Sequence, residues 1–330
     1  MELVKKNIAL VTGGYSGEAQ ISYKSALQIE NNLDTDLFNI YKIDIRKDNW
    51  YYQPTTGGES TVNKCDFTIL SNGVKINFDA VLIGIHGTPG EDGKLQGYFD
   101  MLGIPYTGCN AATSAITFNK RYTTAVAGAS GIAVAKSMLF FSTDDKSTWQ
   151  NAAQLTFPLF VKPNNGGSSI GMSKIVDATE INTAFTKAFA EDNQVLVEEY
   201  ISGREFTIGV YKHEATIITL PITEVITHNF FFDFEAKYQG KSEEITPAII
   251  TPTEQSNLLD AAKKIYAIFN CSGVVRIDFI YNPTSQQAYM LEINTVPGQS
   301  EASVVPQQVR ASGGNLTQFY TTLIQQALGK

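Results

Sequence analysis

The chain has 330 residues, enough for two or three domains with sizeable cores. Its hydrophobic content of 43% and charged content of 18% are typical of a soluble globular protein. The net charge of −8 argues against non-specific binding to nucleic acid or to anionic membranes. The 3 cysteines are odd in number and form no CxxC motif, which predicts reduced thiols and no structural zinc site. No apolar stretch is long enough to span a bilayer, so we expect a cytoplasmic protein without membrane contact.

The N-terminal part of the chain predicts an α/β sheet. Residues 7–14 have the pattern of a buried strand that ends in two glycines, and a helix is expected from there to about Glu30. Further strands are expected at Phe38–Ile43 and Ala80–Ile85. Glu18 falls in the first turn of the helix, where a carboxylate can simply complement the helix dipole. The glycines do not form GxGxxG, so a dinucleotide fingerprint is not indicated.

A glycine-rich loop, His86–Gly93, follows the last of these strands and leads into a predicted helix at Leu95–Leu102. Ligands in open α/β sheets gather at such strand ends. His86 is one of only 3 histidines, and it either bonds the backbone of its own loop or takes part in a site. No GxSxG motif is present, so nothing supports a hydrolase triad. A domain boundary is expected after Gly108.

The middle of the chain predicts helices near Ala111–Ala127 and Glu180–Ala190, with a strand at Phe157–Val161 between them. Lys162 stands at the end of that strand and opens a loop rich in glycine and serine. A lysine beside mobile backbone N–H groups suits a phosphate, although a surface hairpin has the same composition. Lys120, near the end of the first helix, would by itself be interpreted as a solvated surface charge.

Two more strands are expected at Val195–Ile201 and Glu205–Tyr211. The first resembles an interdomain strand whose free backbone edge can hydrogen-bond a purine. Glu198 and Glu205 are placed to accept a hydrogen bond from an adenine amine or a ribose hydroxyl. The stretch 230–238 is aromatic and acidic, which fits either core aromatics entering a surface loop or a closing lid.

The last part of the chain predicts a helix at 253–269, a hairpin at 274–297 and a closing helix over 303–330. Its amphipathic tail, Leu316–Leu328, is expected to serve packing. If the hairpin is centred on Ser285, strand pairing sets two acidic residues opposite each other near its open end.

Alternation along the hairpin puts Arg276 and Asp278 on one face, with Asp278 opposite Glu292 and Arg276 opposite Asn294. Leu291, like Ile293, is expected on the apolar reverse face. Carboxylates that lie this close repel each other, and a hard divalent cation with oxygen ligands relieves the repulsion. The alternative is the solvated outer face of an edge hairpin.

Together these stretches resemble one family, the D-alanine–D-alanine ligases of the ATP-grasp superfamily. One such motif is weak evidence, whereas an ordered set over essentially the whole chain is strong. The matches, in the family's order, are Gly13–Glu18, His86–Gly93 with Gln96-Gly97, Ile104–Gly108, Lys162–Met172, Glu198–Glu205, Glu235–Tyr238, Arg276–Asp278, Glu292–Asn294 and Pro297-Gly298.

The resemblance implies an α/β fold, α+β in the C-terminal half, with a three-domain ATP-grasp architecture. Residues 1–108 would form an N-terminal open parallel α/β domain that binds substrate. Residues 109–197 would form a central subdomain with the phosphate loop. Residues 198–330 would form a C-terminal subdomain with the metal-binding hairpin and a lid at about 228–247. ATP would lie between the central and C-terminal subdomains.

The resemblance also implies the ligands of ATP and of the metal. Lys120 and Lys162 would contact the α- and β-phosphates, and Lys237 would reach the γ-phosphate as the lid closes. The remaining nucleotide-binding residues would be Ser168 in the phosphate loop and Glu198, Glu199, Tyr200, Ile201 and Glu205 around adenosine. Two Mg²⁺ ions, with Mn²⁺ as an alternative ion, would be held by Asp278, Glu292 and Asn294.

For the amino-acid substrates, the resemblance implies that Glu18 binds the ammonium group of the first D-alanine and His86 its carboxylate. Ser168 and Tyr238 would join Glu18 in a hydrogen-bonded set. The oxyanion hole and the pocket for the second carboxylate would be formed by Arg276, the Gly298 N–H group, Ser303 and Val304.

The implied function is the ATP-dependent joining of two D-alanine molecules through an acyl phosphate, which supplies a peptidoglycan precursor, in a homodimer. The rivals are a D-alanine–D-lactate ligase, another ATP-grasp carboxylate–amine ligase and an ATP-binding regulator without catalysis. Family members that make the ester usually carry Phe in place of Tyr238, which favours the dipeptide. The chain departs from the family at Asn119, where Asp is frequent, at Gln239, where an apolar residue is common, and at Gln299-Ser300, where Leu or Met and Thr are usual.

Overall fold

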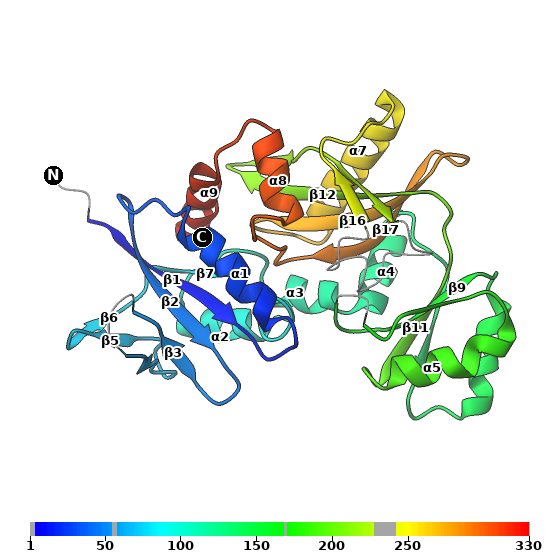
Figure 1. Ribbon diagram of the computed structural model, residues 1–330, viewed down its shortest axis with the longest axis horizontal. Helices are drawn as coiled ribbons and strands as arrows, with labels where there is room; N and C mark the ends of the chain where they lie inside the picture. The colour runs from blue at the N-terminus through cyan, green and yellow to red at the C-terminus, as the bar shows by residue number, and fades with distance from the viewer. Residues whose placement is uncertain (1–3, 55–57, 168–169, 228–241, 330) are drawn as a thin grey trace.

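The computed structural model describes residues 4–54, 58–167, 170–227 and 242–329. The described strands form three main sheets and one small hairpin (Figure 1). Within the described residues, no helix combines the length and apolar character that crossing a bilayer requires.

The first sheet contains the N-terminal strands, with β1 parallel to both β2 and β7. Its strand order is β4 (Ser60–Thr61), β3 (Trp50–Tyr52), β2 (Phe38–Ile45), β1 (Lys6–Gly13) and β7 (Ala80–Ile83). The side hairpin consists of β5 (Ile69–Ser71) and β6 (Val74–Ile76).

Alternate residues of β1 enter two different cores, as expected for a strand that is buried on both faces. Ile8 and Leu10 pack with α1 (Ala19–Glu30) and with the last helix, α9 (Leu316–Leu328). Ala9 and Val11 pack on the other face with α2 (Lys94–Leu102). Figure 1 shows α9 beside α1, so the end of the chain returns to the first sheet.

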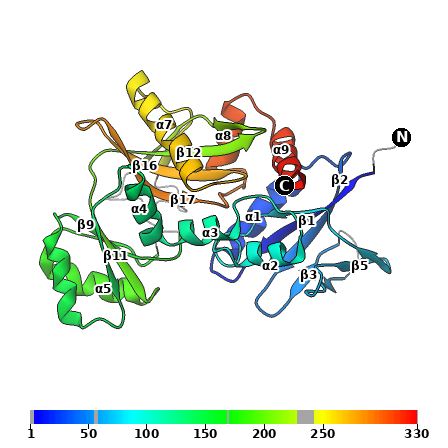
Figure 2. The same cartoon turned by 180° about the vertical axis from the view of Figure 1, so that it is seen from behind.

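The predicted helix over Ala111–Ala127 is two helices, α3 (Ala111–Phe118) and α4 (Lys120–Ala129). Asn119 breaks the helix because its backbone is extended, and its side chain accepts a hydrogen bond from the N–H group of Tyr122 as the cap of α4. Lys120 therefore begins a helix and does not lie near the end of one. In Figure 2, α3 and α4 run between the first sheet and the second.

The second sheet is antiparallel and follows α4 in the chain. Its strand order is β10 (Ser173–Ile175), β9 (Leu159–Pro163), β11 (Gln194–Glu199) and β8 (Ser137–Phe141), and its helical segments are η1 (Lys146–Gln154), η2 (Ala178–Glu180) and α5 (Ile181–Phe189). The core lies between this sheet and α5, where the rings of Trp149 and Phe185 stack with centroids 5.1 Å apart.

The third sheet holds the predicted hairpin. Its strands are β15 (Ser242–Ile245), β14 (Thr223–Thr227), β12 (Arg204–His213), β16 (Val275–Asn282) and β17 (Gln287–Asn294), with β13 (Thr216–Thr219) paired to β12. The helix α7 (Pro252–Ile268) packs on one face and begins with a capping box formed by Thr251 and Glu254. Since β15 belongs to this sheet, the last part of the predicted lid at 228–247 is a strand.

The closing segment forms two helices, α8 (Val304–Ala311) and α9, where we predicted one. Gly313 ends the first of them with a φ of +77°, a left-handed conformation that favours glycine. The side chain of Asn315 then caps α9 by accepting the N–H groups of Thr317 and Gln318. The break lets α8 pack on the third sheet while α9 packs on the first.

Candidate active site

The β16–β17 hairpin has the pairing that the sequence predicts at its open end. Asp278 stands opposite Glu292, and Arg276 stands opposite Asn294. Side chains of directly paired residues lie on the same face of a sheet, so this face carries two carboxylates, one carboxamide and one guanidinium. The same face of the neighbouring strand β12 adds Thr207, whose hydroxyl donates to Asp278 Oδ1 at 2.5 Å.

The pairing depends on a β-bulge that the sequence reading missed. Phe279 pairs with Met290, whereas its neighbour Asp278 pairs with Glu292, so Leu291 is an extra residue in β17. The buried residues at this point are Met290 and Ile293, and Leu291 is only partly buried. The prediction that Leu291 lies with Ile293 on the apolar face was therefore wrong.

Arg276 and Asp278 form a two-pronged ion pair. Arg276 Nε lies 2.9 Å from Asp278 Oδ1 and its NH2 group lies 2.7 Å from Oδ2, while Glu292 Oε1 is 3.7 Å from the same NH2 group. Burial disfavours the guanidinium charge, but the Asp278 and Glu292 carboxylates more than offset it and raise the pKa of Arg276. Arg276 is therefore a permanently charged, rigidly held donor.

The oxygen atoms of this face fit a divalent cation. Two carboxylates and an amide oxygen are the hard ligands that Mg²⁺ prefers. After its bonds to Arg276, Asp278 Oδ2 retains a lone pair, and the Glu292 side chain is 35% exposed. The Asn294 Oδ1 atom accepts the N–H group of Val296. No group of three or more His, Cys, Asp or Glu that could hold a metal ion occurs in the described part of the chain, so the amide is needed to complete a three-ligand set.

Glu18 lies between two loops from different parts of the fold. Glu18 is the N-cap residue of α1, and its side chain makes no capping hydrogen bond there. A Cβ atom on Gly87 would lie 2.7 Å from Glu18 Oε2, and one on Gly167 would lie 3.0 Å from Oε1. The carboxylate is thus packed against the His86–Gly93 loop on one side and the phosphate loop on the other.

His86 is buried, with 5% of its surface exposed. Its Nε2 atom lies 2.9 Å from the hydroxyl of Ser25, and its backbone N–H group donates to the hydroxyl of Ser22. Burial and then the nearby Arg276 charge lower the pKa of His86 to about 4, so the ring is neutral at pH 7.

Glu91 is a buried carboxyl group that the sequence reading did not single out. Its Oε2 atom accepts the backbone N–H group of Gly87, and its buried Oε1 atom has no hydrogen-bond partner among the described residues. Burial and then the charge of Glu18 raise the pKa of Glu91 to about 8. Its position in the glycine-rich loop His86–Gly93 was the only signal that could have pointed to it.

The two lysines predicted to bind phosphate lie at the phosphate loop, which Lys162 opens. Lys162 Nζ forms a largely buried ion pair with Glu198 Oε2 at 2.6 Å. Lys120 Nζ donates to the carbonyl of Gly166, and its backbone N–H group donates to the carbonyl of Asn164. The Asn119 side chain also donates to Asn165 Oδ1, so the start of α4 is tied to this loop.

The residues predicted to surround adenosine lie from the end of β11 to the start of β12. The Glu199 carboxylate accepts the N–H group of Thr156, and the N–H group of Tyr200 donates to the carbonyl of Pro158. Ile201 is partly buried directly after them. Glu205 lies on β12, opposite Ile280 and Val225. Two groups of this stretch therefore already have partners within the protein.

The loop after β17 brings Gly298 against the start of α8. A Cβ atom on Gly298 would lie 2.7 Å from Ser303 Oγ, so a larger residue here would have to displace the Ser303 hydroxyl. Ser303 Oγ lies 2.7 Å from Ser300 Oγ and is not used to cap α8. Val304 is the first residue of α8, where the N–H group lacks a partner within the helix and suits a carboxylate.

Three predicted site residues, Ser168, Lys237 and Tyr238, lie outside the described residues. The rest form two groups. One gathers Glu18 and His86 with Arg276 and the loop after β17, and the other gathers the lysines with the end of β11. The fold has three sheets, a phosphate loop with two lysines beside it and an acidic hairpin. Together these features define the ATP-grasp class of proteins.

Comparison with known proteins identifies the family. Residues 7–109 match the model described as D-ala D-ala ligase N-terminus, and residues 126–325 match the model described as D-ala D-ala ligase C-terminus. The chain belongs to the D-alanine–D-alanine ligase family. It is 43% identical over 326 residues to the D-alanine–D-alanine ligase of Parabacteroides distasonis, with 98% of each chain covered. It is 40% identical over 323 residues to that of Flavobacterium johnsoniae, covering 98% of this chain and 99% of the relative.

Solved structures with similar folds come from the same group of enzymes. The VanG D-Ala:D-Ser ligase from Enterococcus faecalis superposes with a TM-score of 0.88 at 32% identity, with 98% of this chain and 100% of that one covered. D-alanyl-alanine synthetase A from Vibrio cholerae gives a TM-score of 0.88 at 27% identity, with 100% of both chains covered. The predicted ATP-grasp fold is therefore confirmed.

Proposed function

We propose that this protein joins two D-alanine molecules into D-alanyl-D-alanine, using ATP and a divalent metal ion and releasing ADP and phosphate. The product is a precursor for peptidoglycan synthesis. The observation that carries the proposal is the face shared by Asp278, Glu292, Asn294 and Arg276, in a chain of this ligase family. A lone nucleotide-binding module does not require that set.

In the first step, the carboxylate of one D-alanine attacks the γ-phosphorus of ATP, which gives an acyl phosphate and ADP. Lys120 and Lys162 lie at the phosphate loop, where they would neutralise the phosphates, and Lys237 would add a charge at the γ-phosphate. Asp278, Glu292 and Asn294 would hold a divalent ion, which would supply charge neutralisation for the ATP phosphates. Glu18 would bind the ammonium group of this D-alanine, and Ser168 and Tyr238 would orient Glu18.

In the second step, the amine of the other D-alanine attacks the acyl carbon, and phosphate leaves the tetrahedral intermediate. Arg276 and the Gly298 N–H group would stabilise the developing oxyanion. The second carboxylate would bind at the start of α8, where Ser303 and the Val304 N–H group lie. Because an acyl phosphate hydrolyses in water, closure over the site also protects the intermediate.

The nucleotide would lie at the end of β11. Adenosine would contact Glu198, Glu199, Glu205 and the backbone at Tyr200 and Ile201. The Lys162–Glu198 ion pair supports this assignment because both side chains are largely buried. It places a positive group for the phosphates next to a carboxylate for adenosine. We also propose that His86 contributes to the first-substrate pocket, as a neutral ring.

The finer parts of the proposal are two bound ions, Mg²⁺ with Mn²⁺ as an alternative, a homodimer and a cytoplasmic location. The net charge of −8 and the absence of a spanning helix among the described residues are compatible with that location. We further propose domains at 1–108, 109–197 and 198–330, which leave each main sheet in a single domain, apart from the last two residues of β11.

The function is tested by incubating the protein with ATP, Mg²⁺ and one amino acid at a time and following ADP release. D-Alanine should give rapid ADP release that L-alanine does not give. Adding D-lactate or D-serine with limiting D-alanine tests the ester and D-seryl alternatives through the mass of the product. ADP release that does not depend on D-alanine would point to another carboxylate–amine ligase or to a plain ATPase.

The Tyr238→Phe variant tests whether Tyr238 distinguishes a dipeptide ligase from a D-alanine–D-lactate ligase. If the lid tyrosine disfavours D-lactate, the variant should form more depsipeptide than the parent at the same D-lactate concentration. An unchanged product ratio would remove the argument from Tyr238 and leave the dipeptide assignment to rest on the parent protein's own products.

A further inference from the structure

The loop that carries Gly298 is held by a buried chain of hydrogen bonds from the N-terminal part of the protein. The Gln299 N–H group donates to Ser25 Oγ at 3.1 Å, and the same hydroxyl lies 2.9 Å from His86 Nε2. Ser25 is fully buried, and Gln299 and His86 are 6% and 5% exposed. Residues that are 274 positions apart in the chain therefore meet at a buried site.

The hydrogens of this chain can be placed from the donor and acceptor capacities of its groups. Ser25 accepts the Gln299 amide hydrogen with one of its two lone pairs, so its hydroxyl can still either donate to His86 Nε2 or accept from it. The His86 ring also bonds the backbone of Val296, where only a carbonyl oxygen can accept from the ring. His86 must then carry its hydrogen on Nδ1 and leave Nε2 as the acceptor.

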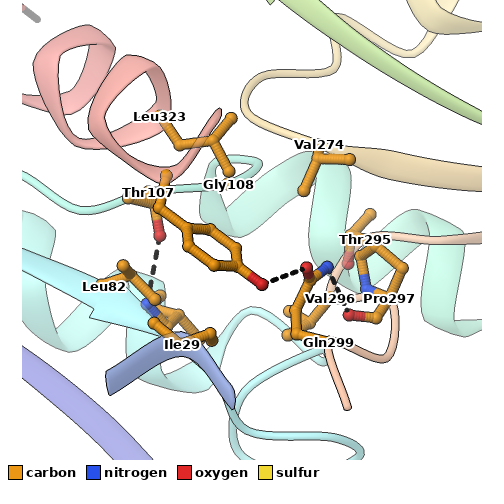
Figure 3. Close-up of a pocket in the computed structure, with 12 residues that line it drawn as sticks. Ile29, Leu82, Thr107, Gly108, Val274, Thr295, Val296, Pro297, Gln299 and Leu323 are labelled. Carbon is orange, nitrogen blue, oxygen red and sulfur yellow. Dashed lines mark hydrogen bonds between the residues drawn. The ribbon is translucent and has the colours of Figure 1, made fainter. Parts of the chain in front are cut away.

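Val296 and Gln299 flank Gly298, so these bonds hold the loop on both sides of the proposed oxyanion donor. The Gln299 side chain adds a third anchor. Its Nε2 group donates to the carbonyl of Pro297 at 3.0 Å, and its Oε1 atom accepts the hydroxyl of Tyr320 on α9 at 3.2 Å (Figure 3). The sequence departs from the usual family pattern at Gln299, and this amide is what reaches Tyr320.

Packing alone does not fix the loop. A cavity of about 30 Å³ lies beside it and is lined by Tyr320, Leu323 and Val274 together with loop residues (Figure 3). Such a void leaves room for a small displacement of the loop, because dispersion contacts are missing on one side. The directional bonds from Ser25 and His86 therefore add to packing in holding the loop beside Gly298.

We propose that Ser25 is a positioning residue for ligation, which aims the Gly298 amide by bonding both Gln299 and the ring of His86. The inference rests on the proposed ligase function. Ser25 touches neither substrate nor nucleotide in this scheme, and it acts through the loop. An error of about 1 Å in a catalytic group can cost about 100-fold in rate, so loss of the hydroxyl should lower kcat by roughly tenfold to 100-fold.

The test compares Ser25→Ala with Ser22→Ala. Both serines are fully buried on α1, and both hydroxyls bond His86, but Ser22 bonds its backbone N–H group and does not reach the loop. Ser25→Ala should lower kcat by roughly tenfold to 100-fold while the KM for ATP stays within about twofold. Ser22→Ala should keep most of the parent kcat. Ser25→Cys, which preserves a weak donor and a similar volume, should fall between the two and replaces Ser25→Ala if that variant does not fold.

A second readout does not depend on activity. Long-range proton–nitrogen NMR spectra of the imidazole rings, with His86 assigned through His86→Asn, should show the Nδ1–H tautomer in the parent and in Ser22→Ala. Ser25→Ala should keep the Nδ1–H tautomer, because the Val296 carbonyl remains, but should shift the Nε2 resonance, because Nε2 loses the hydroxyl that donates to it. Parent-like kcat and an unchanged Nε2 resonance in Ser25→Ala would overturn the proposal, as would equal kcat losses in the two alanine variants. If the parent itself releases no ADP with D-alanine, the ligase function fails, and the spectra still decide whether Ser25 bonds the ring of His86.

Discussion

Asp278 and Glu292 face each other across the β16–β17 ladder because Leu291 is an extra residue in β17. A regular ladder that continued the pairing of Phe279 with Met290 would set Leu291 opposite Asp278 and turn Glu292 to the other face. The bulge thus corrects the register on the acidic side while Met290 and Ile293 stay in the core. Bulges of this kind often re-aim a side chain next to an active site.

Replacing Glu292 by Gln tests the metal site. The variant keeps the side-chain volume and loses one of the two carboxylate charges, so the Mg²⁺ concentration for half-maximal activity should rise by at least about tenfold. Titration of activity with Mg²⁺ at saturating ATP measures the change. Asp260→Asn, which removes an exposed charge from α7, is the matched control and should leave the midpoint unchanged. Equal midpoints in Glu292→Gln and the parent would exclude Glu292 as a ligand.

Arg276→Ala should lower kcat by about 100-fold to 1,000-fold, because it removes an oxyanion donor. Arg276→Lys keeps a positive charge but cannot make the two parallel bonds to Asp278, so it should recover only part of the loss. Steady-state kinetics on both variants, with circular dichroism as a check of folding, measures the effect. Near-normal turnover in Arg276→Ala would remove this residue from the mechanism.

The Lys162–Glu198 pair should be costly to break in the nucleotide-free protein. Glu198→Ala leaves the largely buried Lys162 charge without its partner, and we expect a loss of about 3–5 kcal/mol in the free energy of unfolding. Glu199→Ala removes one hydrogen bond from the N–H group of Thr156 and should cost about 1 kcal/mol. Urea unfolding of the two variants measures both values. Similar losses would show that the ion pair contributes no more to the free energy of unfolding than the single hydrogen bond does.

Glu91 predicts a pH dependence of stability. Its pKa is raised to about 8 in the folded protein, chiefly by burial, whereas the unfolded group titrates near its ordinary value of 4.5. Between these values the folded state binds more protons than the unfolded state, so the Glu91 contribution to stability falls as the pH rises through this window. The slope is at most about 1.4 kcal/mol per pH unit for one proton.

Glu91→Gln isolates this effect. His86, whose pKa is lowered to about 4, acts in the opposite direction between pH 4 and its ordinary 6.5, and it is present in both proteins. The difference in unfolding free energy between the variant and the parent should therefore grow in the variant's favour from pH 5 to pH 8. A difference that does not change with pH would mean that Glu91 titrates normally.

The sequence predicted those parts of the fold and site that depend on local alternation. The order of β1, α1 and β7 follows from side-chain period. The pairing of Asp278 with Glu292 was predicted from a turn centred on Ser285, whereas the observed ladder pairs Asn282 with Gln287 and reaches the Asp278–Glu292 pair only through the bulge at Leu291. That bulge could not be predicted, because one inserted residue can be absorbed at several points of a hairpin and tertiary packing selects the point.

Other features could not be predicted from the sequence because they depend on contacts between residues that are distant in the chain. The sequence predicts one continuous helix over Ala111–Ala127, but Asn119 divides it in two. The Asn119 side chain caps α4 and donates a hydrogen bond to Asn165 in the phosphate loop. Ser25 reads as an ordinary residue in the middle of a helix, and only the fold brings it to Gln299. Glu91 looks like any loop carboxylate until burial is known.

In the proposed reaction, the terminal phosphate of ATP is transferred to the carboxylate of D-alanine. Incubation with ATP, Mg²⁺ and D-alanine whose carboxylate carries 18O, followed by phosphorus NMR of the released phosphate, tests it most directly. The account predicts one labelled oxygen in phosphate for each dipeptide formed. Dipeptide accompanied by unlabelled phosphate would contradict an acyl-phosphate route, and with it the roles proposed for the Asp278–Glu292 face.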